Sequence, residues 1–391
     1  MWTVLEGSVA IAEAVRRCRP RVISAYPITP QTHIVEHLAR LAADGELDAE
    51  VVNVESEHSA ASVVLGAVAT GVRAYTATSS QGLLLMAEVL YNIAGLRLPV
   101  VLTCANRAVS SPINIWNDHQ DAMAVRDSGW IQLFAEDNQE AVDLHIQAYR
   151  IAELTRLPVM VNVDGFVLTH AYEPVDLPDQ EEVDAFLPPF EPKVRLDPDH
   201  PLTLGMLAEP HVYMEARYAL NEAVLGSKEV ILQVQREFQE RFGRSSGGLI
   251  SVDAPEDAEI VFVAMGSVLG TIREAAESLR HRGIRAGVLK VTCFRPFPGE
   301  AIASALRGTP RFIVLEKALS MGSGGILANE MRAAFYERDR RAEIISVIAG
   351  LGGRDVTVAQ IEEVAQAVLQ GERGPVFLGL DQRLLAREGT S

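Results

Sequence analysis

Polar residues that could bind a ligand stand directly after apolar, strand-like runs in the first half of the chain. The run Arg21–Tyr26 leads into Pro27, Ile28, Thr29 and Pro30, and each proline restricts its own φ and the conformation of the residue before it. This segment is therefore predicted to be a stiffened strand-to-helix turn. Turns at the carboxyl ends of parallel strands bind ligands, although Pro and Thr at this place are also ordinary signals for a helix start.

A carboxylate and a serine-rich turn follow the next strand-like runs. In "NVESEHSA", Glu57 opens a helix of small apolar residues, so its carboxyl group is expected to face a sheltered environment. The alternative is a carboxylate placed favourably at a helix N-terminus. In "TATSSQGL", the turn with Ser79 and Ser80 could present backbone N–H groups to an anion or to a polar ring edge. Alternatively, either serine could be a simple N-cap.

Arg107 follows another buried, strand-like run, so its guanidinium is expected at the same sheet edge as Thr29 and Glu57. A guanidinium suits bidentate binding of a carboxylate, and the alternative is a structural ion pair with an acidic loop. The polar segment Asn117–Asp121 fits none of the standard metal signatures. A hydrogen-bonded loop is therefore predicted there.

The placement of these residues depends on an alternation of strands and helices that runs to about residue 164. Helical patterns separate strand-like runs at residues 21–26, 50–55, 73–80, 98–106 and 157–164. Such an alternation predicts a parallel sheet covered on both faces. The residues before the first of these strands, 1–17, are predicted to form the first helix.

The rest of the chain predicts a connector and a second α/β domain. Residues 170–201 are rich in proline and acidic residues and are expected to be extended, and 211–244 has the pattern of one long helix. The predicted division is 1–170 as an α/β domain, 171–257 as the connector and long helix, and 258–391 as the second α/β domain. Glycine-rich turns at 266–270 and 320–325 match neither G-x-G-x-x-G nor a P-loop, so they are predicted to be packing turns.

Charge and cysteine content exclude several classes of protein. The formal net charge of −17 argues against nucleic acid as a partner, because phosphates require Lys and Arg. The three cysteines, Cys18, Cys104 and Cys293, form no C-x-x-C pair, so cysteine ligation cannot assemble a structural zinc site or an iron–sulfur cluster from this chain. Their sparse use suits a reducing cytoplasm. Neither a signal peptide nor a membrane segment is predicted.

Six segments taken together resemble one enzyme family. They are "AYPITPQTHIVE", "NVESEHSA", "TATSSQGL", "GLRLPVV", "ANRAVSSPINIWNDHQD" and "DSGWIQLFAEDNQEA", and they cover most of residues 22–170 in that order. They closely resemble the alpha subunit of the pyruvate:ferredoxin oxidoreductases, which are thiamine-diphosphate-dependent 2-oxoacid:ferredoxin oxidoreductases. The resemblance implies two parallel-sheet α/β domains, a pyrimidine-binding one followed by one like the C-terminal domain of transketolase.

The resemblance also implies roles for individual residues. Glu57 matches the acid that hydrogen-bonds the aminopyrimidine ring nitrogen of the cofactor, which favours the imino tautomer that removes the thiazolium C2 proton. Arg107 and Thr29 match the residues that hold the carboxylate and the carbonyl of the 2-oxoacid, so the two prolines are expected to fix Thr29 against the substrate. Further cofactor contacts are expected from Pro27, Ile28, Ser79 and Ser80.

Partner chains are implied by what this chain lacks. Related enzymes bind the diphosphate and Mg²⁺ through a Gly-Asp-Gly motif with a downstream Asn, and the nearest approach here, Asn162–Phe166, lacks both. Thiamine diphosphate is therefore expected to be shared with a beta subunit that holds Mg²⁺, with no metal ligand on this chain. The [4Fe-4S] clusters are expected on partner subunits, of beta, gamma and delta type or fusions of them, and ferredoxin is expected to dock on one of these.

The expected reaction converts pyruvate, coenzyme A and oxidised ferredoxin to acetyl-CoA, CO₂ and reduced ferredoxin, reversibly, in a cytoplasmic hetero-oligomer. The same chemistry on 2-oxoisovalerate or 2-oxoglutarate remains open. A non-catalytic structural subunit is a further alternative, although a scaffold has no need of Glu57, Thr29 and Arg107 together. A flavin- or NAD-linked dehydrogenase component is disfavoured, because the sequence has no dinucleotide-binding fingerprint.

Overall fold

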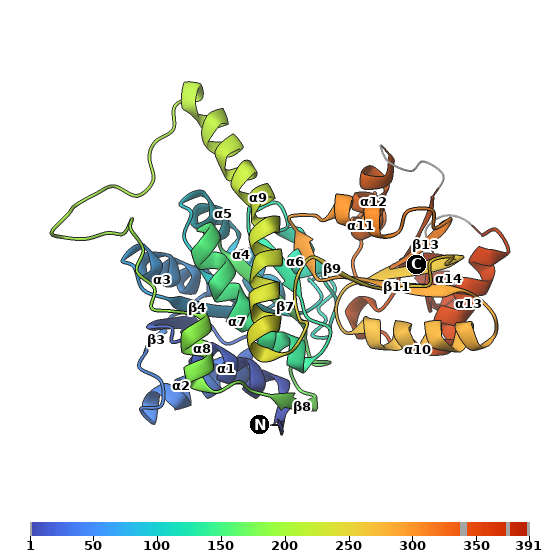
Figure 1. The fold of residues 1–391 in the computed structure, drawn as a ribbon, viewed down its shortest axis with the longest axis horizontal. Coiled ribbons are helices and arrows are strands. Elements are labelled where there is room, and N and C mark those ends of the chain that lie inside the picture. Colours follow the sequence, from blue (N-terminus) through green and yellow to red (C-terminus); the bar gives the residue numbers. More distant parts are fainter. Residues whose placement is uncertain (1, 337–341, 373–375, 389–391) are drawn as a thin grey trace. The chain divides into compact units, whose positions relative to one another are not determined.

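The computed structural model describes residues 2–336, 342–372 and 376–388 (Figure 1). The chain divides into two compact units, which are described separately below. The first comprises residues 1–251 with 291–298, and the second comprises residues 252–290 with 299–391.

The first unit is built on a sheet with the strand order β12-β6-β7-β5-β4-β2-β3. Its strands are β2 (Val22–Ala25), β3 (Glu50–Asn53), β4 (Ala74–Thr78), β5 (Val101–Asn106), β6 (Ile131–Phe134), β7 (Val159–Asp164) and β12 (Cys293–Arg295). The pairings among β2 to β7 are parallel, whereas β12 runs antiparallel to β6. Because β4, β5 and β7 are buried along their whole length, the predicted parallel sheet with covered faces is confirmed.

Helices cover both faces of this sheet. One face packs against α1 (Gly7–Arg17), α2 (Thr32–Ala43), α7 (Asn138–Thr155), α8 (Gln180–Phe186) and α9 (Pro210–Phe242). The helices on the other face are α3 (Glu57–Ala69), α4 (Ser80–Leu85), α5 (Ala87–Gly95) and α6 (Gln120–Ala124). The predicted long helix is confirmed as α9, which ends where Gly243 takes a φ of 69°, a conformation that glycine adopts without steric cost.

Two segments near the start and middle of the chain differ from the prediction. The first helix begins only at Gly7, because Trp2–Glu6 forms β1 and pairs antiparallel with β8 (Tyr172–Asp176). The extended connector predicted for 170–201 was wrong for β8 and for α8. A pairing between strands so far apart in sequence leaves no local pattern. For α8 a local signal did exist, since Asp179 and Glu182 form a capping box at its N-terminus.

The apolar segment from Ala286 to Arg295 is divided between the units. Its first part is β11 (Ala286–Val291) of the second unit, and its second part is β12, which pairs with β6. Strand β6 was not predicted, because Gln132 interrupts its apolar run. The Gln132 side chain is buried and donates to the Ala122 carbonyl at 2.9 Å, so a polar residue is accommodated inside the sheet.

The second unit is also α/β, as predicted, with the strand order β15-β14-β13-β10-β11-β9. Its other strands are β9 (Ile250–Asp253), β10 (Ile260–Ala264), β13 (Arg311–Glu316), β14 (Glu343–Ile348) and β15 (Val376–Phe377), and its helices are α10 (Val268–His281), α11 (Gly299–Ala305), α12 (Ile326–Tyr336), α13 (Val358–Leu369) and α14 (Gln382–Glu388). The pairings β11/β10, β10/β13, β13/β14 and β14/β15 are parallel. Across the described residues, no helix has both the length and the apolar character that crossing a bilayer requires.

A buried carboxylate holds the glycine-rich turn of the second unit. Glu316 accepts hydrogen bonds from the backbone N–H groups of Leu327 (2.7 Å) and Ala328 (3.2 Å) at the start of α12. Burial raises the pKa of Glu316 to about 7. A Cβ at Gly325 would lie 1.9 Å from Glu316 Oε1, so only glycine fits there. The turn at 320–325 therefore packs closely on β13, in agreement with the prediction of a packing turn.

Candidate active site

The chemistry-bearing residues of the first unit meet at the carboxyl edge of its sheet. Thr29 follows β2, Glu57 opens α3 after β3, Ser80 opens α4 after β4, and Arg107 follows β5. Because β3, β2, β4 and β5 are consecutive, parallel neighbours in the sheet, the turns after them lie along one edge. The topology therefore brings together the segments that the sequence singled out.

Arg107 and Thr29 are in direct contact. The Arg107 guanidinium donates from Nη1 to the Thr29 carbonyl oxygen at 3.0 Å and from Nε to the Asn114 carbonyl oxygen at 3.1 Å. Arg107 is 8% exposed, and burial lowers its pKa. Within the described residues no carboxylate forms an ion pair with this guanidinium. The Asp121 carboxylate nevertheless acts on Arg107 electrostatically, opposing the effect of burial on its pKa, and the remaining N–H groups of the guanidinium can meet an anionic ligand.

The segment Pro27–Thr29 is anchored to the sheet through the residues that follow it, and its own residues are exposed or half-buried. Pro30 is buried, and Gln31 donates its side-chain amide to the Ala77 carbonyl at 2.7 Å, which fixes the end of the turn to β4. Thr29 and Pro27 are exposed, and Ile28 is half-buried. The stiffened turn is thus anchored on the sheet and presents its preceding residues outward.

Glu57 lies in a sheltered position, as predicted, next to a glycine of α4. Its side chain is 7% exposed, and no hydrogen bond reaches its carboxylate from any described residue. A Cβ at Gly82 would lie 2.7 Å from Glu57 Oε1 and 2.5 Å from Thr78 Oγ1. The absence of a side chain at Gly82 therefore makes room for the carboxylate and the hydroxyl.

Two hydroxyl groups at the end of β4 and in the turn after it are buried and unpartnered among the described residues. These are Thr78 Oγ1 and Ser79 Oγ, for which the described part of the chain supplies no hydrogen-bond partner. Ser79 is the N-cap residue of α4 but makes no side-chain capping bond, so the simple N-cap does not describe it. Buried polar atoms are normally satisfied, and the unpaired Thr78 hydroxyl, which lies with the Glu57 carboxylate around Gly82, fits a polar ligand edge.

Ser80 makes hydrogen bonds that stabilise the same turn. Its hydroxyl donates to the Ala108 carbonyl at 2.5 Å, and its backbone N–H donates to Asp121 Oδ2 at 2.9 Å. Its φ is 49°, in the left-handed region that non-glycine residues rarely occupy. Strain of this kind costs on the order of 1–3 kcal/mol and is found mainly where function requires it. Ser80 thus ties the turn after β4 to the segment after β5.

Asp121 links these turns and was not recognised from the sequence as a site residue. Its Oδ2 accepts from the backbone N–H groups of Ser80 and Arg107, each at 2.9 Å, and its Oδ1 accepts from Asn106 Nδ2 at 3.0 Å and from the Ala122 N–H at 2.8 Å. The side chain is fully buried, and burial raises its pKa. One carboxylate therefore fixes the backbone on both sides of the site.

The rest of the 117–121 segment is hydrogen-bonded, as predicted. Asn117 donates its amide to the Asn106 carbonyl at 3.3 Å, and His119 Nε2 lies 2.7 Å from Asp164 Oδ1 with both side chains 1% exposed. Asp164 is the acidic residue of "NVDGF". Its Oδ1 thus has a hydrogen-bond partner within the first unit.

Comparison with known proteins shows which family this chain belongs to. Residues 13–236 match the family described as "Pyruvate flavodoxin/ferredoxin oxidoreductase, thiamine diP-bdg", and residues 258–361 match "Pyruvate:ferredoxin oxidoreductase core domain II". The chain is 51% identical to pyruvate synthase subunit PorA of Methanothermobacter thermautotrophicus over 381 residues, 97% of this chain and 98% of that one. The chain belongs to the pyruvate:ferredoxin oxidoreductase family. The resemblance drawn from the sequence is thereby confirmed.

Another relative is similar in sequence, and two solved structures are similar in fold. Ketoisovalerate oxidoreductase subunit VorA of Pyrococcus abyssi is 45% identical over 364 residues, 93% of this chain and 92% of that one. The fold resembles 2-oxoglutarate:ferredoxin oxidoreductase from Magnetococcus marinus, with a TM-score of 0.72 and 19% identity over 93% of this chain and 65% of that longer one. It also resembles a split-gene transketolase, with a TM-score of 0.55 and 14% identity over 94% and 98% of the two chains. The predicted fold class is confirmed.

Proposed function

We propose that this chain is the thiamine-diphosphate-binding alpha subunit of a pyruvate synthase. The enzyme converts pyruvate, coenzyme A and oxidised ferredoxin to acetyl-CoA, CO₂ and reduced ferredoxin, and the reaction is reversible. The observation that carries the proposal is the contact between Arg107 and Thr29 at the sheet edge that Glu57 shares. A buried guanidinium that forms no ion pair with a carboxylate of the described residues is suited to a small anionic substrate.

The residues around Glu57 fit the polar edge of an aminopyrimidine. A ring of this kind offers both donors and acceptors, and the sheltered Glu57 carboxylate, with the buried hydroxyls of Thr78 and Ser79, offers the complement. When bound, thiamine diphosphate supplies the electron sink for cleaving the bond between the carboxylate and the carbonyl carbon of a 2-oxoacid. Glu57 holds a proton on the ring nitrogen, and Pro27, Ile28, Ser79 and Ser80 shape the adjoining surface.

Arg107 and Thr29 bind the 2-oxoacid. The charged N–H groups of Arg107 bind the substrate carboxylate, and the Thr29 hydroxyl donates to the substrate carbonyl. The hydrogen bond from Arg107 Nη1 to the Thr29 carbonyl oxygen, 3.0 Å long, holds these two residues together. Asp121 fixes the backbone at Arg107, so it acts as a positioning residue.

Partner chains complete the enzyme in this proposal. Burial raises the pKa of the Cys18, Cys104 and Cys293 thiols, and neutral buried thiols do not ligate iron. We therefore assign the [4Fe-4S] clusters to beta, gamma or delta-type subunits and the Mg²⁺ to the beta subunit, with ferredoxin docking on a partner. The three free cysteines suit the reducing cytoplasm, where we place the assembly.

Pyruvate is favoured over branched 2-oxoacids because identity to the pyruvate synthase subunit, 51%, exceeds identity to the ketoisovalerate subunit, 45%. The test is the specificity constant of the assembled complex for pyruvate, 2-oxoisovalerate and 2-oxoglutarate, with coenzyme A and a low-potential acceptor. We expect pyruvate to give the highest value. A higher value for either competitor would assign the sibling specificity, and no turnover of any 2-oxoacid would identify a non-catalytic subunit.

A further inference from the structure

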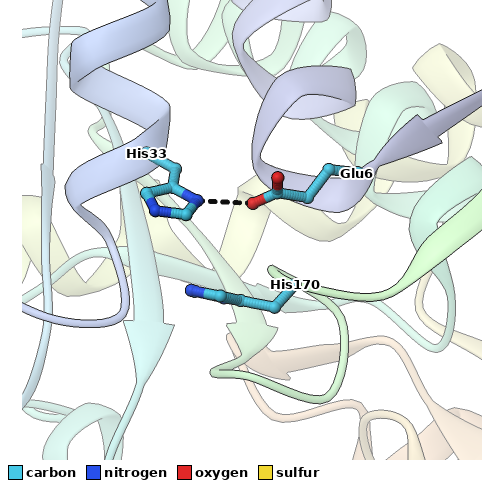
Figure 2. Close-up of side chains that lie close together, drawn as sticks. All are labelled: Glu6, His33 and His170. Carbon is cyan, nitrogen blue, oxygen red and sulfur yellow. Dashed lines mark hydrogen bonds and ion pairs between the residues drawn. The ribbon is translucent and has the colours of Figure 1, made fainter.

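Two imidazoles and a carboxylate meet on the first unit, outside the site described above. Glu6 ends β1, His33 lies in the first turn of α2, and His170 lies in the loop between β7 and β8. Figure 2 shows His33 and Glu6 facing each other, with the His170 ring beside them. One ligand atom from each lies within 4.8 Å of the other two. Three segments that are distant in sequence thus place metal-ligating groups at one point.

We propose that Glu6, His33 and His170 bind a divalent first-row transition metal ion, with Zn²⁺ as the typical occupant. Two imidazole nitrogens and one carboxylate oxygen are a donor set that Zn²⁺ favours, and three protein ligands leave a fourth position for solvent. This assignment is independent of the proposed reaction, since none of the three residues is part of the candidate active site.

Binding the ion requires at least one imidazole to re-orient, because the His33 and His170 rings now lie 4.8 Å apart and 33° from parallel, whereas a metal ion lies in the plane of each ring that binds it. Ligand atoms around tetrahedral zinc are roughly 3.3 Å apart. His33 Nδ1 and Glu6 Oε1 now lie 2.6 Å apart in a hydrogen bond, so they must separate slightly, and the third ligand atom must approach. The His33 side chain is 47% exposed and the Glu6 side chain is 15% exposed, so the imidazole has room to move while the carboxylate stays anchored.

One nitrogen of the His170 ring has a partner on its own loop, and the other is available to a ligand in one of the two tautomers. Its Nδ1 lies 2.8 Å from Thr169 Oγ1, and that hydroxyl also accepts from the Phe166 N–H at 2.9 Å. With the proton on Nδ1, the lone pair of Nε2 is available to the ion, and a hydrogen bond to the other ring nitrogen is the usual support for such a ligand. The ring is also held between His33 and Phe166, with centroids 4.8 Å away on each side.

Metal binding would connect helix α2 to a turn that is already tied to α1. Gly7 N–H donates to the Ala171 carbonyl at 3.0 Å, and Ser8 N–H donates to the Thr169 carbonyl at 2.9 Å, so α1 and the loop form one body. Through the ion, His33 would attach the start of α2 to this body. Pro30 packs directly on Gly165, which belongs to the same loop as His170. By fixing this loop, the ion would also stabilise the Pro27–Pro30 turn that packs on it.

The experiment is a zinc titration of the chelator-treated full-length chain, with a chromophoric competitor to measure affinity. The wild-type chain is expected to bind one equivalent of Zn²⁺ at micromolar concentration or tighter, and Co²⁺ is expected to give the absorption of a low-coordinate site. His33→Ala and His170→Ala should each weaken zinc binding at least tenfold. The matched control is His211→Ala, because His211 is 73% exposed and 3.5 Å from Glu209; it should leave the affinity unchanged.

Thermal unfolding separates lost ligation from lost folding. Zinc should raise the unfolding midpoint of the wild-type and His211→Ala chains but not of His33→Ala, whose midpoint without zinc should match the wild type. If His170→Ala does not fold, Glu6→Gln takes its place as the second ligand variant. The proposal is overturned if the wild-type chain binds less than one equivalent of zinc, or if the ligand variants bind it as tightly as the wild type.

Discussion

Replacing Arg107 by alanine should reduce the specificity constant for pyruvate without reducing the amount of assembled enzyme. The guanidinium donates to the Thr29 and Asn114 carbonyls and has further N–H groups for a carboxylate. Thr29 is exposed, so water can replace the bond that its carbonyl loses. The effect is therefore expected mainly on substrate binding in the transition state.

The size of this loss follows from the interaction removed. A hydrogen bond to a charged group contributes about 1.5–3 kcal/mol, and about 1.4 kcal/mol corresponds to a factor of ten in rate. Arg107→Ala should therefore lower kcat/KM for pyruvate by roughly ten- to 150-fold. Arg107→Lys keeps the charge but loses the fork geometry, so it should recover only part of the activity.

Arg97 provides a matched control within the same unit. It also donates to two backbone carbonyls, those of Arg156 (3.0 Å) and Thr155 (2.7 Å), and burial lowers its pKa as it does for Arg107. It precedes β5, however, and so lies away from the carboxyl edge. Arg97→Ala should leave kcat/KM near the wild-type value. The reasoning is refuted if Arg107→Ala, loaded with cofactor and fully assembled, retains the wild-type constant for every 2-oxoacid, or if Arg97→Ala loses as much.

Three further substitutions test two features of the candidate site and one of the second unit. Gly82→Ala places a Cβ 2.7 Å from Glu57 Oε1; we expect weaker thiamine diphosphate binding, measured by titration of the apo-complex, and an unchanged affinity would show that the cofactor does not depend on this clearance. Asp121→Asn removes a buried charge that four N–H donors and the Cys104 thiol share; denaturant unfolding should show a loss on the order of 1–3 kcal/mol, with a raised KM for pyruvate, and a variant with wild-type KM would remove Asp121 from the site. Burial raises the pKa of Glu316 from 4.5 to about 7, so the folded state retains a proton that the unfolded chain releases, and stability should fall by up to about 3 kcal/mol as the pH rises through this window. Glu316→Gln should flatten that dependence in thermal unfolding, and a wild-type slope in the variant would contradict it.

The parts of the fold that the sequence predicted are those with strong local patterns. Strands β4, β5 and β7 are continuous apolar runs bounded by turn residues, and their burial along the whole length matches that composition. Long helix α9 has an uninterrupted helical pattern from proline to glycine. In contrast, β1 and β8 are short and partly exposed, and only their mutual pairing makes them strands.

The candidate site was predicted in outline but not in its connections. A parallel sheet places Thr29, Glu57 and Arg107 along one edge by topology alone, so their grouping could be predicted from the order of elements. The bond from Arg107 to the Thr29 carbonyl depends on how residues 107–116 fold back, and no local pattern encodes that. Asp118 and Asp121 are equivalent in sequence terms, yet only Asp121 is placed to hold Ser80 and Arg107.

Exchange of the thiamine C2 proton in the assembled complex, followed by NMR after acid quench, tests the central assignment of Glu57 most directly. Glu57→Gln keeps the shape of the side chain but cannot hold the ring-nitrogen proton in the same way, so the exchange rate should fall about a hundredfold or more in cofactor-saturated enzyme. Glu55→Gln is the control, because Glu55 is exposed and its carboxylate accepts from Ser59 Oγ instead; its exchange rate should equal the wild type. An unchanged rate in Glu57→Gln would mean that Glu57 is only a carboxylate at the start of a helix, and the account of this site would be wrong.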